Sequence, residues 1–334
     1  MNETFHYLET GSVDPCYNLA TEQYVLEHKR EGNWLLLWQN ANTIVVGLNQ
    51  NTAEEINAPF VREHGITVVR RMTGGGAVYH DLGNLNYSFI SDVGNAEELS
   101  VRRFTEPVCR ALKAMGINAQ TSGRNDILVD GKKISGVAQR IVRGRILHHG
   151  TLLFHSDINM IAGALRADPT KFASKSVKSV RTRVGNLSDY LPADIGMAEF
   201  WNGILKELTH DGLIPETLKD EEQREIRELA DEKYRSWDWT YGHSPDYNYR
   251  NRDRFPGGTL EVRMNIHRGK IEEIVFYGDY MATEPQFSLT DALRGVRAER
   301  QTVSEVLDRF DLPSYFGGIR KQEILNLMLN GEEQ

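Results

Sequence analysis

The sequence predicts an α+β protein built on a large mixed sheet, with a smaller α+β unit at the C-terminal end. In the first 155 residues, short β-branched or aromatic runs are joined by brief turns and do not alternate strictly with helices. That pattern favours an antiparallel or mixed sheet over a doubly wound one. An aromatic, polar and irregular stretch over residues 237–255 then precedes a fresh hairpin pattern. These two observations predict the fold class and its division.

The first helix is predicted from residue 15, because Asp14 can cap it and Pro15 suits a first helical turn. Runs at 34–38, 43–48, 66–70 and 84–91 have the composition of strands. A helix is predicted from about residue 100 to residue 115, and Gly116 is a normal C-terminal breaker.

The strongest hairpin signal is Asp130-Gly131, between predicted strands at 126–129 and 133–142. A further strand at 146–154 follows Arg143-Gly144. Helices are predicted at 197–208 and 216–233, and the second is so charged that most of it must face water. The C-terminal part predicts a hairpin of 259–266 and 271–277, then two or three short helices.

A chain of 334 residues has about the length of two domains. We place the boundary near residue 248, which gives a catalytic domain of residues 1–248 and an accessory domain of residues 249–334. The second unit lies within the size range of independent domains.

Composition excludes several classes of protein. The formal net charge is −8, which argues against a general nucleic-acid binder. The apolar runs are far shorter than the roughly 20 residues that span a bilayer, and the N-terminus lacks a secretory signal. Two cysteines cannot form a disulfide framework or a four-ligand zinc site. We therefore expect a cytoplasmic protein without a membrane segment.

The first candidate motif is the run RRMTGGGAVYH at residues 70–80. Glycines after a strand let the backbone turn sharply and bring its N–H groups against an anion, and the two arginines can add contacts to phosphate or carboxylate. The run lacks the Walker A pattern and the last glycine of a dinucleotide fingerprint. The alternative is a flexible turn with two solvated arginines.

The second candidate is Asp126 with the run GKKISG at residues 131–136. Strand alternation puts Lys132 and Lys133 on opposite faces, so one of them can point into the concave side of the sheet. A lysine there suits an anionic intermediate, and Asp126 could hold a magnesium ion on a phosphate. The alternative is an ordinary surface hairpin.

Two weaker candidates follow. His148 and His149 are adjacent in a predicted strand, so at most one of them lines a pocket, and a hydrogen-bonded core histidine is the alternative. Residues 171–183 hold five cations and no acid, which is typical of a site for one anionic group or of a solvated loop.

Taken in order, these motifs closely resemble the lipoate–protein ligase family over essentially the whole chain. The resemblance implies a large biotin/lipoate ligase-like domain and a small accessory domain. It also implies the reaction: lipoate and ATP, with Mg2+, give lipoyl-AMP and pyrophosphate, and the lipoyl group passes to a lysine of an acceptor. Two steps are needed because hydroxide is a poor leaving group, and fixed cations must offset the repulsion between two anions.

The resemblance also implies roles for individual residues. Lys133 is implied as the catalytic residue, contacting the lipoyl carbonyl and the phosphates. The implied ATP-binding residues are Arg71, Gly76, Ala77, Val78, Tyr79 and Lys133. The implied lipoate-binding residues are Arg71, Gly75, Gly76, Lys133, Ala138 and His149. A loop over residues 171–187, with Lys175, Lys178, Arg181 and Arg183, is expected to fold over the adenylate.

The implied acceptors are the lipoyl domains of 2-oxoacid dehydrogenase E2 subunits and the glycine cleavage H protein. We expect the ligase to be a monomer that does not bind nucleic acid. One alternative is an octanoyl- or lipoyl-transferase of the same fold, which needs a thiolate in the pocket. Cys16 and Cys109 are predicted in helices away from the motifs, which argues against it. The other alternative is a non-enzymatic lipoate-binding sensor, which would release no pyrophosphate.

Overall fold

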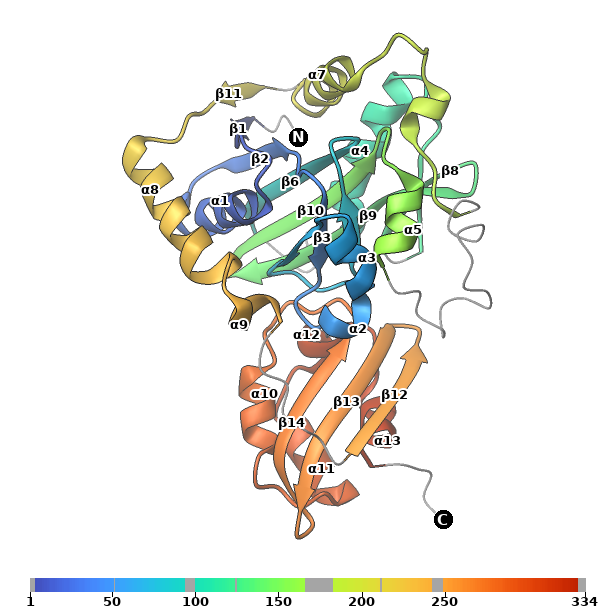
Figure 1. Ribbon diagram of the computed structural model, residues 1–334. Helices are drawn as coiled ribbons and strands as arrows, with labels where there is room; N and C mark the ends of the chain where they lie inside the picture. The colour runs from blue at the N-terminus through green and yellow to red at the C-terminus, as the bar shows by residue number, and fades with distance from the viewer. Residues whose placement is uncertain are drawn as a thin grey trace.

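The computed structural model describes residues 4–50, 52–93, 100–123, 125–165, 183–210, 212–241 and 249–329. Its centre is an eight-stranded mixed sheet with the strand order β11-β1-β2-β6-β10-β9-β8-β7 (Figure 1). In that order the strands are β11 (Leu213–Pro215), β1 (Phe5–Glu9), β2 (Asn33–Trp38), β6 (Asn84–Asp92), β10 (Arg145–Leu153), β9 (Lys132–Val142), β8 (Asp126–Val129) and β7 (Gln120–Ser122). The predicted mixed sheet is confirmed.

Helices cover both faces of this sheet. One face carries α1 (Pro15–His28), with α8 (Asp220–Leu229) and the π-helix η3 (Ala230–Tyr234) packed beside it. The Asp14 side chain accepts a hydrogen bond from the backbone N–H of Cys16 at 3.0 Å, which fixes the start of α1 as the sequence predicts. The other face carries α4 (Val101–Ala114) and α7 (Met197–Leu208), which pack on each other.

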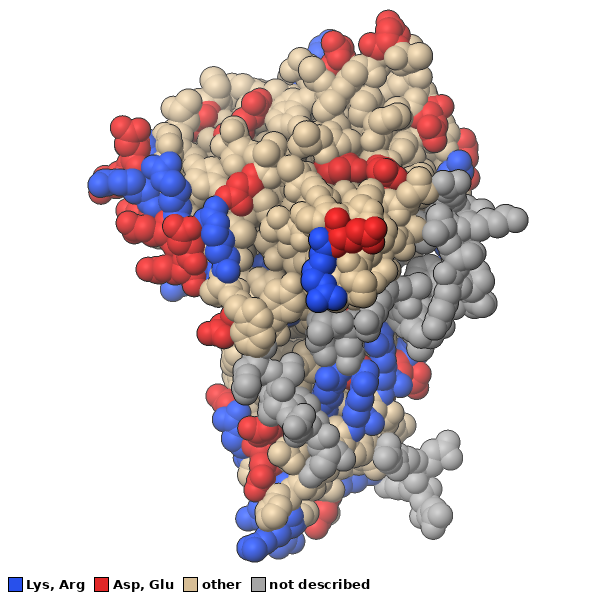
Figure 2. Space-filling view, viewed as in Figure 1, with Lys and Arg blue, Asp and Glu red and all other residues tan. Residues whose placement is uncertain are grey.

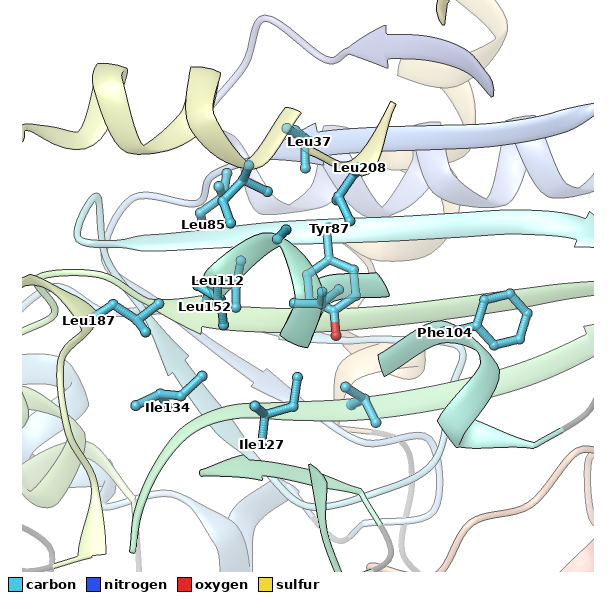
Figure 3. Close-up of a cluster of buried hydrophobic side chains, with 14 of the residues drawn as sticks. Leu37, Leu85, Tyr87, Phe104, Leu112, Ile127, Ile134, Leu152, Leu187 and Leu208 are labelled. Atoms are coloured by element: carbon cyan, nitrogen blue, oxygen red, sulfur yellow. The ribbon is translucent and has the colours of Figure 1, made fainter. Parts of the chain in front are cut away.

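The main core lies between the sheet and helices α4 and α7. Figure 3 shows Tyr87, Leu152 and Ile134 from the sheet meeting Phe104 and Leu112 from α4. These side chains are buried, and each aliphatic one contributes roughly 1.5–3 kcal/mol of transfer free energy to folding. This packing makes the sheet a rigid base for whatever lies on its opposite face.

A second sheet of three strands, in the order β4-β3-β5, lies beside the first. It comprises β3 (Thr43–Val46), β4 (Thr67–Arg70) and β5 (Val78–His80), with short helices α2 (Thr52–Glu55), α3 (Ala58–Glu63) and α5 (Ile158–Ala164) around it. Because β4 and β5 are its two edges, the triglycine run between them must cross the end of β3. The sheet thereby fixes where the glycine loop lies.

The C-terminal unit has a core of its own around a three-stranded antiparallel sheet. Its strands are β12 (Tyr249–Phe255), β13 (Gly258–His267) and β14 (Lys270–Gly278), and its helices are α10 (Phe287–Leu293), α11 (Arg300–Leu307), α12 (Leu312–Phe316) and α13 (Lys321–Leu329). The β13–β14 turn has positive φ angles of 48° at Arg268 and 75° at Gly269, as the sequence predicts for a two-residue hairpin.

Three local predictions differ from the structure. The helix predicted at 216–233 begins at Asp220, and its last turn is the π-helix η3. The stretch predicted to be irregular contains α9 (Trp237–Thr240) and strand β12. Four helices follow the C-terminal hairpin among the described residues, where two or three were predicted. The sequence YRNRDRF lacks β-branched residues, and β12 is a strand because it pairs with β13 along its whole length.

Charge on the surface agrees with the prediction for α8. Only Ile226 of this helix is buried, and Figure 2 shows its side chains as a cluster of both signs at the left edge.

The remaining described helix is a short 3-10 turn, η2 (Leu187–Tyr190). None of the helices described in the structure is long and apolar enough to cross a membrane. The predicted domain boundary near residue 248 lies outside the described residues.

Candidate active site

A pocket lies on the α1 face of the large sheet, under the glycine loop. It follows a row of residues across neighbouring strands. Trp38 on β2 is paired with Asn86 on β6, and Asn86 is paired with Thr151 on β10. The backbone N–H of Gly136 on β9 donates to Thr151 Oγ1 at 3.1 Å. The pocket therefore crosses four strands, from β9 to β2.

Lys133 marks the β9 end of this row. Its Nζ lies 2.7 Å from Asp126 Oδ1, and the two side chains are 38% and 35% exposed. A Cβ built on Gly136 would lie 3.1 Å from the same Nζ, so the amine folds over the β9 backbone. Lys132 does not line the pocket and instead contacts Gly185. The two lysines thus differ in direction, as strand alternation predicts.

Arg71 is buried beneath the glycine loop, with only 6% of its surface exposed. Its Nε donates to Thr73 Oγ1 at 3.0 Å, and a terminal nitrogen donates to the Gly74 and Gly76 carbonyls at 2.6 and 2.8 Å. Burial lowers the pKa of Arg71 to about 10, although Glu22 opposes this, so the guanidinium stays charged at neutral pH. It holds the loop's shape and places a fixed positive charge behind it.

Arg70, the first arginine of the motif, has a different role from the anion contact predicted for the pair. It is 7% exposed. Its guanidinium donates to the backbone carbonyls of Gly47, Leu48 and Gln50, and to those of Trp239 and Thr240. Arg70 therefore ties the residues after β3 to helix α9 and does not point at the pocket.

A buried polar chain under the loop joins the predicted His149 to Glu22, a residue that the sequence reasoning missed. His149 Nδ1 lies 2.9 Å from a carboxylate oxygen of Glu22, and His149 Nε2 lies 2.7 Å from Thr73 Oγ1. A carboxylate only accepts, so Nδ1 carries a proton and donates to Glu22, while Nε2 shares a hydrogen bond with the Thr73 hydroxyl. The Thr73 oxygen in turn accepts from Arg71 Nε. Glu22 thereby orients the loop through His149.

No local signal pointed to Glu22. Nearly every residue of α1 is buried, so its amphipathic pattern is weak. The signal that could have found Glu22 is a glutamate in a predicted helix that has no distinct polar face. Such a carboxylate is buried and needs partners. His148 points to the other face, where its ring stacks on Phe104 at 4.8 Å, so only one of the two histidines reaches the pocket.

The structure brings most of the predicted residues together. Those lining the pocket are Arg71, Gly75, Gly76, Ala77, Val78, Lys133, Ala138 and His149. Tyr79 does not line it: its side chain is 5% exposed, and its hydroxyl donates to Asn42 at 3.0 Å. Arg183 is exposed and does not line the pocket, while Lys175, Lys178 and Arg181 fall outside the described residues.

The two cysteines are poorly placed for thioester chemistry. Neither lines the pocket, and burial raises the pKa of Cys16 and of Cys109 to about 11. Both are therefore thiols and weak nucleophiles at neutral pH. Among the described residues, no group of three or more His, Cys, Asp or Glu side chains could hold a metal ion. In the segments that the structure describes, Asp126 is the carboxylate that pairs with Lys133.

Two protein families match the chain. The lipoyl protein ligase A/B catalytic domain matches residues 14–209, and the bacterial lipoate protein ligase C-terminus matches residues 244–328. A Bacillus subtilis protein named lipoate-protein ligase LplJ is 42% identical over 94% of this chain and 97% of its own length. Lipoate–protein ligase 1 of Staphylococcus aureus is 41% identical over 95% of this chain and 97% of its own length.

Solved structures agree on the fold. P. falciparum LipL1 in complex with lipoate superposes with a TM-score of 0.81, covering 98% of this chain and 100% of that one, at 24% identity. A lipoate-protein ligase A bound with ATP has a TM-score of 0.63 at 28% identity, covering 72% of this chain and 99% of that one. A bipartite ligase from Thermoplasma acidophilum has a TM-score of 0.65 at 29% identity, covering 75% and 100%.

Proposed function

The chain belongs to the lipoate–protein ligase family, and from that premise we propose that its pocket joins lipoate to ATP and passes the lipoyl group to a protein lysine. One observation carries the proposal. Lys133, the glycine loop and the buried Arg71 line one pocket that crosses the sheet as a narrow row. Two cations, Lys133 and Arg71, line this pocket beside the glycine loop, where two anions would have to meet.

In the first step a carboxylate oxygen of lipoate attacks the α-phosphorus of ATP. A bond forms between that oxygen and phosphorus, and the bond to the β-phosphate oxygen breaks, which releases pyrophosphate. The two reactants repel each other, and Lys133 and the charge of Arg71 would offset that repulsion. Lys133 can leave its ion pair with Asp126 at little cost, because a pair exposed to this degree contributes only about 0–1 kcal/mol.

In the second step the amine of an acceptor lysine attacks the acyl carbonyl carbon. The bond from that carbon to the AMP oxygen breaks, AMP leaves with the electron pair, and the nitrogen gives up a proton to solvent. The acceptors that we propose are E2 lipoyl domains and the glycine cleavage H protein. The family membership supports this, as does the structural analysis of the T. acidophilum lipoylation system, which pairs a lipoate protein ligase with its E2 lipoyl domain.

We also propose that magnesium enters with the triphosphate. Mg2+ is commonly held by one or two carboxylates together with substrate phosphates, so the single carboxylate of Asp126 beside Lys133 fits this use. The ion supplies charge neutralisation on the phosphates. Asp126 would hold it on the β8 side of the pocket, close to the amine that faces the same phosphates.

The remaining proposals concern organisation. A division into residues 1–248 and 249–334 is supported by the two matched families, which leave residues 210–243 between them. The separate hydrophobic core of the C-terminal unit also supports it. A cytoplasmic location and a monomeric state stay predictions from the sequence.

The test is pyrophosphate release on mixing the protein with lipoate, ATP and Mg2+, followed by mass spectrometry of an added E2 lipoyl domain. We expect pyrophosphate, and an acceptor mass increase of one lipoyl group. Lipoamide is the matched control, because without a carboxylate it cannot attack phosphorus and should give no pyrophosphate. Tight lipoate binding with no pyrophosphate would favour a sensor instead.

A further inference from the structure

The end of the pocket far from Lys133 is closed by Trp38, His80 and Asn86, which we call the closed end. Trp38 and Asn86 are paired on β2 and β6, and the His80 ring meets Trp38 edge-on with ring centroids 6.3 Å apart. All three side chains line the pocket, and each is at most 3% exposed. They are buried polar or aromatic groups, not a purely aliphatic wall.

The proton on His80 is fixed by its neighbours. Asn18 Nδ2 donates to the Gln39 carbonyl and to Asn40 Oδ1, at 2.7 and 2.9 Å. The amide nitrogen of Asn40 therefore faces His80 Nδ1, at 3.2 Å, and donates to it. Burial lowers the pKa of His80 to about 3, so the ring is neutral and carries its one proton on Nε2. That Nε2–H has no partner in the described part of the chain.

Asn86 repeats the arrangement on the next element. Its Oδ1 accepts from Asn84 Nδ2 at 2.9 Å, so its acceptor side is occupied within the protein. Its Nδ2 is buried and has no partner among residues 4–329 that the structure describes. Among the described residues that line the pocket, only His80 and Asn86 have such an atom. The closed end therefore presents N–H donors that no acceptor in the described segments satisfies.

The distance between the two ends suits a short acyl chain. Asn86 on β6 is two strands from β9, which carries Lys133. Two inter-strand spacings give about 10 Å, comparable with an extended chain of about eight carbons. With its carboxyl group at Lys133, lipoate would bring its five-membered dithiolane ring to the closed end. The two ring sulfurs carry lone pairs and accept hydrogen bonds weakly, whereas octanoate ends there in a methyl group that cannot accept any.

We propose that His80 and Asn86 make this ligase select the sulfur-bearing dithiolane over the saturated eight-carbon acid. This rests on the proposed function and names its substrate preference. A pocket of purely apolar walls discriminates poorly between chains of similar shape. A pocket with buried donors rejects a ligand that leaves those donors unpaired. The preference arises at the far end from the chemistry, so it acts on both acids before adenylate formation.

The experiment compares kcat/KM for pyrophosphate release with lipoate and with octanoate. We expect the wild-type protein to prefer lipoate by about tenfold or more. Asn86→Leu and His80→Phe each remove one donor and keep the approximate shape. Each should lower the lipoate-to-octanoate ratio by about threefold or more, chiefly through a loss with lipoate.

The matched control is Thr151→Val. Thr151 lies opposite Asn86 on the same face, but its hydroxyl already accepts the Gly136 N–H. This change should affect both acids by the same factor and leave the ratio unchanged.

The outcomes separate the two proposals. Equal wild-type efficiency for the two acids, or an unchanged ratio in both variants, overturns the selectivity while leaving the ligase assignment intact. No pyrophosphate with either acid overturns the assignment and the selectivity together. If neither variant gives a cooperative thermal transition, calorimetric titration of the wild-type protein with each acid decides, and equal affinities would contradict the proposal.

Discussion

At the open end of the pocket, Lys133 and Asp126 are 38% and 35% exposed and carry opposite charges. At the closed end, His80 and Asn86 are 3% and 2% exposed and are neutral. The difference follows from what each end must hold. Charged substrates need cations that can exchange one partner for another, and a nonionic tail needs groups fixed in advance. The two ends lie on different strands of one sheet face, Lys133 on β9 and Asn86 on β6. A single substitution should therefore disturb one end without the other.

The largest effect is expected at the open end. Lys133→Ala should lower the rate of adenylate formation by about 10²–10³-fold, because it removes a donor aimed at developing charge. Its free energy of unfolding should fall by no more than about 1 kcal/mol, since the ion pair that is lost is partly exposed. Pyrophosphate release and thermal denaturation measure the two.

Lys132→Ala is the matched control for that variant, because its side chain is adjacent in sequence but contacts Gly185 instead of lining the pocket. It should retain close to wild-type turnover. Wild-type turnover in Lys133→Ala would refute the role given to this amine.

Arg71→Lys should lower activity and the free energy of unfolding together, unlike Lys133→Ala. A lysine keeps the charge but cannot reproduce the fork that reaches Thr73, Gly74 and Gly76. We expect the free energy of unfolding to fall by about 2–4 kcal/mol as buried carbonyls lose their donors, with activity lost in parallel. Denaturant unfolding measures the first quantity. Full stability with lost activity would show instead that Arg71 serves only the substrate.

The closed end should also affect how the free energy of unfolding depends on pH. The pKa of His80 is lowered to about 3, against about 6.5 in the unfolded chain, so below pH 6.5 the unfolded state binds a proton that the folded state does not. This contribution to stability is complete above pH 6.5 and is lost as the pH falls toward 3, at roughly 1.4 kcal/mol per pH unit. Urea unfolding between pH 7 and pH 4.5 should be less pH-dependent in His80→Phe; an identical slope would contradict a neutral, buried ring.

The smallest effect is expected for Asp126→Asn. Its ion pair with Lys133 is partly exposed, so the free energy of unfolding should fall by at most about 1 kcal/mol. If Asp126 also holds magnesium, the Mg2+ concentration needed for half-maximal pyrophosphate release should rise. An unchanged Mg2+ requirement would remove Asp126 from the metal's surroundings.

Local chemistry made one part of this architecture predictable. The Asp130-Gly131 turn has positive φ angles of 49° and 76°, which these residue types tolerate, and the turn sets the register of the β8–β9 hairpin. Alternation along β9 then separates Lys132 from Lys133. These inferences need only residues that are neighbours in sequence.

The rest depends on the order of strands, which no local pattern encodes. Glu22, His80, Asn86 and His149 lie on four elements and share the pocket region because β2, β6, β10 and β9 are adjacent while β5 approaches from the second sheet. The sequence predicted an anion contact for Arg70. The prediction was wrong because the backbone carbonyls that accept from Arg70 belong to segments around Leu48 and Trp239, which are far from it in sequence. Strand β12 was missed because its arginines fit a strand only when β13 is beside it.

The most direct test of the two-ended pocket is a crystal structure of the protein with lipoate bound. The carboxylate should lie within hydrogen-bond distance of Lys133 Nζ, with the dithiolane ring against His80, Asn86 and Trp38. A lipoate bound in the reverse direction, or outside the row from β9 to β2, would contradict the account.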